Sequence, residues 1–128
     1  MNKRRLPRPT EAELELLRVL WERGPSTVRQ VHEALSQKDT GYTTTLKILQ
    51  KMLDKGLLRR DESQRSHVYT AVGKAEETQR QLVRHLLRRA FGGAAGKLVV
   101  QALSEEKVST EELAEIRRVL DELESRNR

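Results

Sequence analysis

The sequence predicts a mainly α-helical protein with one small β-hairpin. Apolar residues recur at helical spacing in three segments before residue 57 and in three more after residue 73. Between them, residues 57–72 hold two short runs, the second rich in β-branched and aromatic residues, which is typical of strands. Glycine and proline stand at several borders between the segments. The expected order is therefore three helices, a hairpin and three helices.

The first helix is expected to begin after Thr10, because Glu13 stands three residues later and the pair forms a capping-box pattern. The apolar residues that follow at helical spacing are Leu14, Leu17, Leu20 and Trp21. Gly24-Pro25 ends this helix. Ser26 is the expected N-cap of a second, shorter helix. Its single apolar face is formed by Val28, Val31 and Leu35.

The third helix is expected over residues 42–55, with Gly56 as its stop and Lys55 suited to the negative helix end. Its predicted buried face consists of Thr45, Ile48, Leu49, Met52 and Leu53. The opposite face then carries Thr43, Thr44, Lys47, Gln50, Lys51 and Asp54. A run of threonines is unusual for a solvated helix face, because β-branched residues are poorer helix formers than Glu or Lys.

Residues 57–61 and 67–72 are expected to pair as a hairpin around a turn at 63–65. Three further helices are expected over 74–91, over 94–103 and from Ser109 onward, where Ser109 and Glu112 form a second capping-box pattern. The last helix carries apolar residues at heptad spacing: Leu113, Ile116, Leu120 and Leu123.

Three short helices followed by a hairpin within about 75 residues are the winged helix-turn-helix arrangement. We therefore expect a DNA-binding domain at 1–72 and a helical dimerisation domain at 73–128. One α-helix fits into the major groove of duplex DNA, and the third helix suits that role. Its candidate DNA contacts are Tyr42, Thr43, Thr44, Lys47, Gln50 and Lys51. The alternative is an ordinary solvated face.

Two more basic positions are candidate contacts outside this helix. Arg65 lies at the hairpin tip, where it would enter the minor groove or grip a phosphate, or else only keep the tip soluble. Arg8 belongs to a basic arm at residues 1–8, which also holds Lys3, Arg4 and Arg5. Such an arm either lies along the DNA backbone or has no fixed structure.

The charge distribution supports the expected division into a DNA-binding domain and a dimerisation domain. The net charge of +6 sits mainly in residues 1–72, with 14 Lys or Arg against 9 Asp or Glu. Residues 104–125 are acidic instead, with 8 acidic and 3 basic residues, and so are not expected on DNA. Three helices alone bury little surface, so a second copy is expected to cover them, as a homodimer on a pseudo-palindromic site. The expected dimer contacts are Leu82, Leu86, Leu98, Leu113, Ile116, Leu120 and Leu123.

Several classes of site are not expected. The chain has no cysteine, which excludes disulfides and Cys-based zinc fingers, and His32, His67 and His85 lack metal-ligand spacing. No catalytic set of residues stands out, so we expect neither an enzyme nor a cofactor nor a small-molecule substrate. No run of about 18 apolar residues and no signal-peptide pattern is present. A cytoplasmic protein is expected.

The chain resembles the BlaI/MecI family of penicillinase repressors. TEAELELLRVLW at residues 10–21 looks like that family's opening helix, and TTLKILQKMLDKGLL at 44–58 is similar to its recognition helix and first wing strand. Arg65, Val68 and Tyr69 match its wing, although Gln64 replaces the usual glycine. The resemblance implies a homodimeric repressor that binds operators of double-stranded DNA.

The same resemblance implies a way of releasing the operator. In antibiotic-sensing members, a membrane sensor-protease responds to β-lactam, and the repressor is then cleaved in its dimerisation domain. The corresponding bond here is Gln101-Ala102, where the best-known members have Asn-Phe. The copper-responsive branch uses C-terminal cysteines, which this chain lacks. A signal from β-lactam or another stress on the cell envelope is expected, and copper sensing is not.

One alternative function remains open from the sequence, because winged helices also serve as protein-docking domains. The DNA-binding and protein-docking hypotheses predict different salt dependence of the binding affinity, because binding to phosphates weakens steeply as the salt concentration rises.

Overall fold

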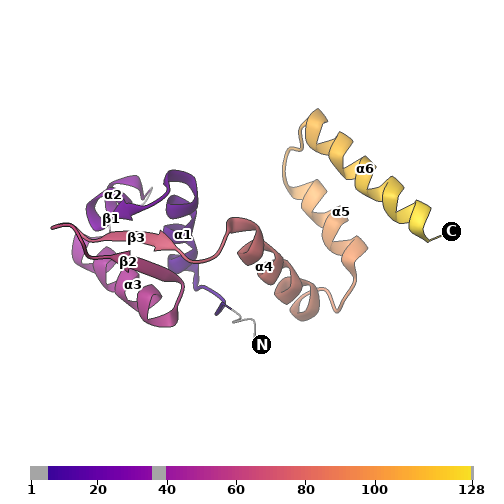
Figure 1. Cartoon of the computed structure of the whole chain (residues 1–128). Helices are drawn as coiled ribbons and strands as arrows, with labels where there is room; N and C mark the ends of the chain where they lie inside the picture. The colour runs from indigo at the N-terminus through magenta and orange to yellow at the C-terminus, as the bar shows by residue number, and fades with distance from the viewer. Residues whose placement is uncertain (1–5, 36–39, 128) are drawn as a thin grey trace. The chain divides into compact units, whose positions relative to one another are not determined.

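The computed structural model describes residues 6–35 and 40–127. In sequence order they form α1 (Glu11–Arg23), β1 (Ser26–Thr27), α2 (Val28–Ala34), α3 (Tyr42–Lys55), β2 (Leu58–Asp61), β3 (Val68–Ala71), α4 (Ala75–Arg89), α5 (Ala95–Glu105) and α6 (Thr110–Arg126) (Figure 1). The predicted fold class, mainly helical with a small β-wing, is confirmed.

Contacts within the chain divide it into two compact units, residues 1–84 and 85–128. The division falls inside α4, whose first turns belong to the first unit. The boundary predicted at residues 72–73 is a different one, because it divides a DNA-binding part from a dimerising part by function. That boundary stays a prediction.

Helix α1 begins as its capping box predicts. Thr10 Oγ1 accepts a hydrogen bond from the Glu13 amide at 3.2 Å, and Glu13 Oε1 accepts one from the Thr10 amide at 2.9 Å. These two bonds satisfy backbone N–H groups that lack partners within the helix. The helix then buries Leu16, Leu17 and Leu20 against the rest of the first unit.

Ser26 is not the cap of α2, and this expectation was wrong. The N-cap is Thr27, whose Oγ1 accepts a hydrogen bond from the Gln30 amide at 3.2 Å in a capping box. Ser26 instead pairs with Tyr69 as part of β1. Only Thr27 has a glutamine three residues later, so the complete capping box decides between two adjacent hydroxyl residues.

Strand β1 makes the wing a three-stranded sheet in the order β1-β3-β2, rather than the two-stranded hairpin expected. Both pairings are antiparallel: Ser26 lies opposite Tyr69, and Leu58 lies opposite Ala71. Tyr69 and Leu58 are buried on the side of the sheet that faces the helices. The sheet therefore anchors the wing in the core of the unit.

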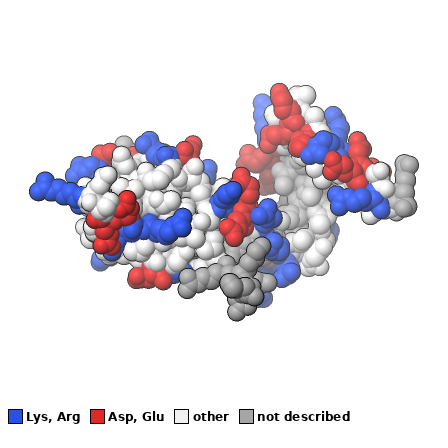
Figure 2. Space-filling view, in the orientation of Figure 1, with Lys and Arg blue, Asp and Glu red and all other residues white. Residues whose placement is uncertain are grey.

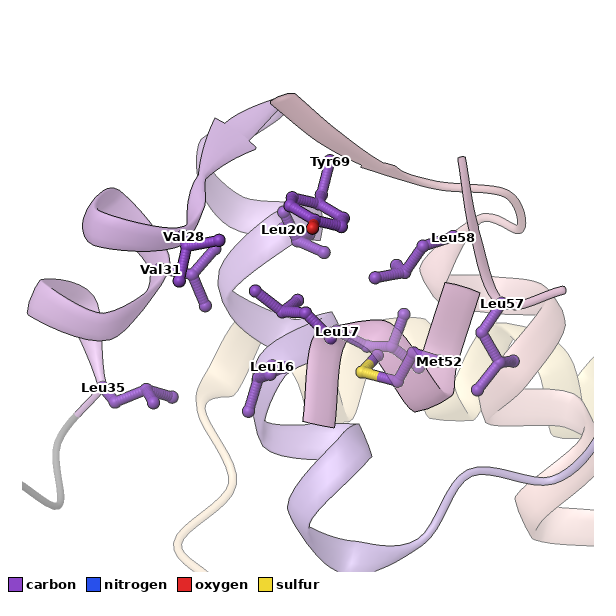
Figure 3. Close-up of a cluster of buried hydrophobic side chains, with 11 residues drawn as sticks. Leu16, Leu17, Leu20, Val28, Val31, Leu35, Met52, Leu57, Leu58 and Tyr69 are labelled. Carbon is purple, nitrogen blue, oxygen red and sulfur yellow. The ribbon is translucent and has the colours of Figure 1, made fainter. Parts of the chain in front are cut away.

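The core of the first unit is closed by side chains from α1, α2, α3 and the sheet, which point toward one another (Figure 3). Its members are Leu16, Leu17, Leu20, Val28, Val31, Leu35, Leu49, Met52, Leu57, Leu58 and Tyr69. Trp21 packs against this cluster, as expected for a residue of the core. A packed core of this kind resists changes in side-chain volume, so it holds the angle of α3 against α1 and α2.

The second unit consists of the end of α4 with α5 and α6. The predicted capping box at the start of α6 is present: Ser109 Oγ accepts from the Glu112 amide at 3.0 Å, and Glu112 Oε1 accepts from the Ser109 amide at 3.1 Å. On the outer surface of α6, Arg118 pairs with Glu115 and Glu122. No residue of α5 or α6 that the structure describes is buried in the single chain.

Over residues 6–35 and 40–127, none of the helices combines the length and the apolar character that a membrane span requires.

Candidate nucleic-acid interface

Helix α3 divides into a buried face and an exposed face along its whole length. Thr45, Leu49 and Met52 are fully buried in the core, as the spacing of these residues predicts. The six candidate DNA contacts are all exposed: Tyr42, Thr43, Thr44, Lys47, Gln50 and Lys51. Their exposure leaves these side chains available to a large partner, and their contact with DNA stays a prediction.

The start of α3 offers backbone donors as well as side chains. Its N-cap is Gly41, and among residues 6–35 and 40–127 no side chain makes a capping hydrogen bond to the first turn. The first amides of a helix have no acceptor within it, and together with the helix dipole they attract anions such as phosphate. The hydroxyls of Thr43 and Thr44 stand in this same first turn. The end of the helix that would enter a groove is therefore its most electropositive backbone segment.

His32 is a residue of this region that sequence reasoning missed. Its Nδ1 is hydrogen-bonded to Oγ1 of the buried Thr45 at 3.0 Å. Its ring meets the ring of Tyr42 edge to face, with 5.8 Å between the centroids and 77° between the planes. His32 thus supports the exposed tyrosine at the start of α3. Its position four residues after Val28, on the apolar side of α2, was the available signal.

The other end of α3 is held by an ion pair with α1. Lys55 Nζ donates to both carboxylate oxygens of Glu13, at 2.9 and 2.8 Å. Burial acts to raise the pKa of Glu13, but the hydrogen bonds from Lys55 and Thr10 outweigh it and hold that pKa below its usual value. Glu13 is therefore ionised at neutral pH, and it links the start of α1 to the end of the candidate recognition helix.

The wing places Arg65 in the exposed turn between β2 and β3. Asp61 orders the beginning of this turn, because its Oδ1 accepts a hydrogen bond from the Ser63 amide at 2.9 Å. Hydrogen bonding from the Ser63 side chain, and to a lesser degree from the Ser63 amide, holds the pKa of Asp61 below its usual value. Basic side chains stand at the tip of the wing, at the left end of Figure 2, with acidic ones beside them.

Arg8 is exposed just before α1. Lys3, Arg4 and Arg5, the other basic residues of the expected arm, lie outside the described residues.

The expected dimer contacts form two groups by exposure. Leu86, Leu120 and Leu123 are 44–51% exposed, whereas Leu82, Leu98, Leu113 and Ile116 are half-buried within the single chain. Other large apolar residues of these helices are exposed as well: Val83, Val99, Val100 and Val119. These exposed side chains lie on α4, α5 and α6, and their contact with a second copy stays a prediction.

The bond Gln101-Ala102 lies inside α5, and both of its residues are exposed. Gln101 lines a hollow of about 730 Å³ within the second unit, together with Phe91, Val100 and Ser104. Among residues 6–35 and 40–127, no three His, Asp or Glu side chains lie together as metal ligands would.

Comparison with known proteins connects this geometry to a family. The profile of the penicillinase repressor family matches residues 9–122. The transcriptional regulator BlaI of Mycobacterium tuberculosis is 36% identical over 124 residues, covering 94% of this chain and 88% of the relative. The penicillinase repressor of Bacillus licheniformis is 25% identical over 126 residues, covering 98% of each.

The fold has a counterpart among solved structures. The DNA-binding domain of the repressor BlaI, known from a solution structure, aligns with a TM-score of 0.50 and 25% sequence identity, covering 59% of this chain and 93% of that domain.

Proposed function

The chain belongs to the penicillinase repressor family of DNA-binding transcription regulators, and on that premise we propose how it binds its operator. Helix α3 enters the major groove, with Thr43, Thr44 and Lys47 facing base edges or phosphates. Tyr42, Gln50 and Lys51 extend the contact along the helix. Arg65 of the wing and Arg8 before α1 reach the neighbouring backbone.

One observation carries this proposal: the side chains on the outward face of α3 are exposed, while Thr45, Leu49 and Met52 on its inward face are buried in the core. A recognition helix needs both properties, because its side chains must reach the bases and its axis must not move. Thr45, Leu49 and Met52 supply the second property, and the Lys55–Glu13 pair adds to it. The three threonines 43–45 thus differ in role: Thr43 and Thr44 are exposed to a partner, and Thr45 packs in the core.

We further propose that two copies bind together. The exposed leucines of α4 and α6 give the second copy an apolar surface to cover, and a two-fold interface uses the same surface on both chains. Two recognition helices related by a two-fold axis read a pseudo-palindromic site. In a bacterium this binding takes place in the cytoplasm, where the chromosome lies.

Release by proteolysis has a structural requirement. Gln101-Ala102 lies in the helix α5, so a protease that reads an extended chain needs this helix to open first. The absence of buried residues from α5 in the single chain favours such local opening. Cleavage there would divide the dimer contacts and weaken binding to the two half-sites. A membrane sensor-protease is the partner that this step requires.

The decisive experiment selects fragments of the source genome with the purified full-length chain and sequences the bound pool. The proposal expects short pseudo-palindromic sites near promoters, protected in footprints as two half-sites. A site beside a gene for a membrane metalloprotease would support the release step. A bound pool with no shared sequence would contradict operator-specific repression.

A further inference from the structure

The tyrosine that begins α3 meets a histidine of the neighbouring helix α2. The two rings lie edge to face, with 5.8 Å between their centroids. Tyr42 is 46% exposed, whereas His32 is half-buried. We call this pair the His32–Tyr42 contact. Both residues belong to the first unit, so the contact is a feature of the winged helix itself.

A hydrogen bond holds the His32 ring from the side of the core. Its Nδ1 lies 3.0 Å from Oγ1 of Thr45, a fully buried residue of α3. The same Thr45 hydroxyl donates to the backbone oxygen of Gly41, the N-cap of α3, in a long hydrogen bond of 3.5 Å. Because one ring nitrogen is engaged with a buried hydroxyl, the imidazole cannot turn without giving up this bond.

The place of Tyr42 gives this contact a functional meaning. Tyr42 is the first residue of α3, and its side chain therefore stands at the end of the helix that is proposed to enter the major groove. His32 supports it from α2 and is bonded inward to Thr45. The histidine thus links the buried face of α3 to the first side chain of its exposed face.

Holding a side chain in place before binding raises affinity. An exposed tyrosine samples several rotamers, and ordering such a side chain on binding lowers affinity by about two- to tenfold. An edge-to-face pair of aromatic rings favours one arrangement by a similar factor, about two- to tenfold. The His32–Tyr42 contact is therefore strong enough to offset the entropy of fixing Tyr42 against DNA.

We propose that His32 is a positioning residue for operator recognition, whose ring holds the Tyr42 side chain in the orientation that contacts DNA. His32 acts through Tyr42 and needs no DNA contact of its own. The inference rests on the proposed function, which places Tyr42 at the DNA. It adds a residue of α2 to the machinery that reads the operator.

Three substitutions separate the ring of His32 from its hydrogen bond. His32→Asn and His32→Gln remove the ring but keep an amide that can donate to Thr45 or accept from it. His32→Phe keeps an aromatic ring but cannot form the hydrogen bond. Urea denaturation of each variant shows that it is folded before its affinity is compared.

The test is a double-mutant cycle in DNA affinity, made with the full-length chain and a duplex that carries one half-site of the selected operator. Fluorescence anisotropy gives the affinity of the unaltered chain, of each His32 variant, of Tyr42→Ala and of each double variant. With Tyr42 present, the two amide variants should lose affinity about fivefold. With Tyr42→Ala, the same changes should lower affinity by less than about twofold, because no tyrosine remains to be positioned.

His32→Phe is the conservative variant in this cycle. Its ring still meets Tyr42, so with Tyr42 present it should lose affinity only about twofold or less. A role in folding alone predicts no such dependence on the aromatic ring or on the presence of Tyr42.

Glu33→Gln is the matched control, because Glu33 is the exposed neighbour of His32 on α2. Removing its negative charge should raise DNA affinity slightly, by the same factor with Tyr42 and with Tyr42→Ala. A Glu33→Gln effect that depended on Tyr42 would show that any change in α2 disturbs the tyrosine, and would overturn the assignment to His32.

A measurement without DNA tests the contact itself. The chain has two tyrosines, Tyr42 and Tyr69, and the NMR signals of their rings are told apart by the Tyr42→Ala variant. A neighbouring aromatic ring shifts the signals of nearby protons, so His32→Asn should move the Tyr42 signals. Tyr69 is buried in the core, and its signals should stay where they are.

Three results would overturn the inference. In the first, the amide variants weaken binding equally with Tyr42 and with Tyr42→Ala, so that His32 touches DNA itself or only supports the fold. In the second, His32→Phe loses as much affinity as His32→Asn. In the third, Tyr42→Ala binds as the unaltered chain does. Failure of the unaltered chain to bind the half-site would contradict the proposed function instead.

Discussion

Charged and polar side chains at a few buried positions decide how well α3 is held. Glu13 is the clearest case, because one carboxylate serves both the capping box of α1 and the ion pair with Lys55. Its side chain is 4% exposed, whereas that of Lys55 is 38% exposed. The lysine is therefore partly screened by water, and the pair stabilises less than a fully buried one.

Glu13→Gln should destabilise the fold by about 1–2 kcal/mol at neutral pH, less than a fully buried charged hydrogen bond is worth. The folded pKa of Glu13 lies below its unfolded value of about 4.3. Its stabilisation is thus complete above that value and is lost as pH falls through the folded pKa. Urea denaturation of both chains should show the difference at about pH 7 and a smaller difference at about pH 3.

Glu11→Gln is the control for this pair of measurements, because Glu11 lies in the same helical turn and is exposed. It should change stability by only a few tenths of a kcal/mol, through the helix dipole. A loss for Glu13→Gln that stays the same at both pH values would show that the carboxylate charge is not what stabilises the fold.

Lys47 is exposed on the outer face of α3 and has no role in the core. Lys47→Ala should therefore weaken operator binding by about 1–3 kcal/mol if it contacts a base, with an unchanged free energy of unfolding. Gel shifts with the selected operator measure the first quantity and urea denaturation the second. Lys107→Ala, which removes an exposed charge from the loop between α5 and α6, should bind as before; equal affinities for both variants would remove Lys47 from the interface.

Capping residues and glycines near the helix ends determine where the helices of this chain begin and end. Burial of their apolar faces against other elements or a partner stabilises them. Three complete capping boxes begin α1, α2 and α6. Gly56 ends α3 with a φ of 86°, in the left-handed region that glycine adopts without steric cost. Helix α6 has well-formed ends, but its apolar seam is half-buried at best, so its stability depends on a partner.

Leu120→Glu should convert the dimer into monomers, because it places a charge in the apolar seam of α6 that a second copy would have to bury unpaired. Sedimentation velocity at several protein concentrations measures the outcome. Ser125→Glu adds the same charge five residues along the helix, about 140° around its axis, and should leave the dimer intact. A Leu120→Glu chain that still sediments as a dimer would show that α6 is not the central contact.

Charge is distributed unevenly along the chain as a whole. Basic residues prevail up to residue 72, and the stretch that ends the chain is acidic between residues 104 and 125. Association with DNA is then driven by the first part, through release of counterions from phosphates. In the proposed complex, the acidic part does not contact DNA and pairs with a second copy.

The affinity for the operator should fall steeply as salt rises, with a slope of about −0.9 in log K against log salt for each phosphate neutralised. Arg65→Ala should make this slope shallower by about one for each subunit if the wing grips a phosphate. Anisotropy titrations at four or five salt concentrations give both slopes. Binding that ignores both salt and DNA sequence would favour a protein-docking module over a repressor.

Much of the secondary structure could be predicted, because its signals lie within a few residues of one another. The bounds of α3 follow from helical periodicity and a terminal glycine, and the starts of α1 and α6 follow from capping boxes. The exposed face of α3 could be predicted as well, because the apolar side of the helix packs against the core and the opposite side is left to solvent. The candidate DNA contacts on this helix were accessible to sequence reasoning for that reason.

Other features needed the folded chain. Strand β1 has only two residues, too few for a pattern, and it exists because β3 lies beside it. The Glu13–Lys55 pair joins positions 42 residues apart, and Gln81 meets Leu6 across 75 residues. His32 offers no metal-site spacing, and its contact with Thr45 and Tyr42 appears only once α2 lies against α3.

Amino-acid order alone therefore decided where helices begin and end and which of their faces are apolar, because those properties depend on neighbours along the chain. Packing in three dimensions decided what anchors each end of α3 and which residue the Gln81 side chain meets. Those contacts join residues that are distant in sequence, and their partners are chosen by the core that brings them together.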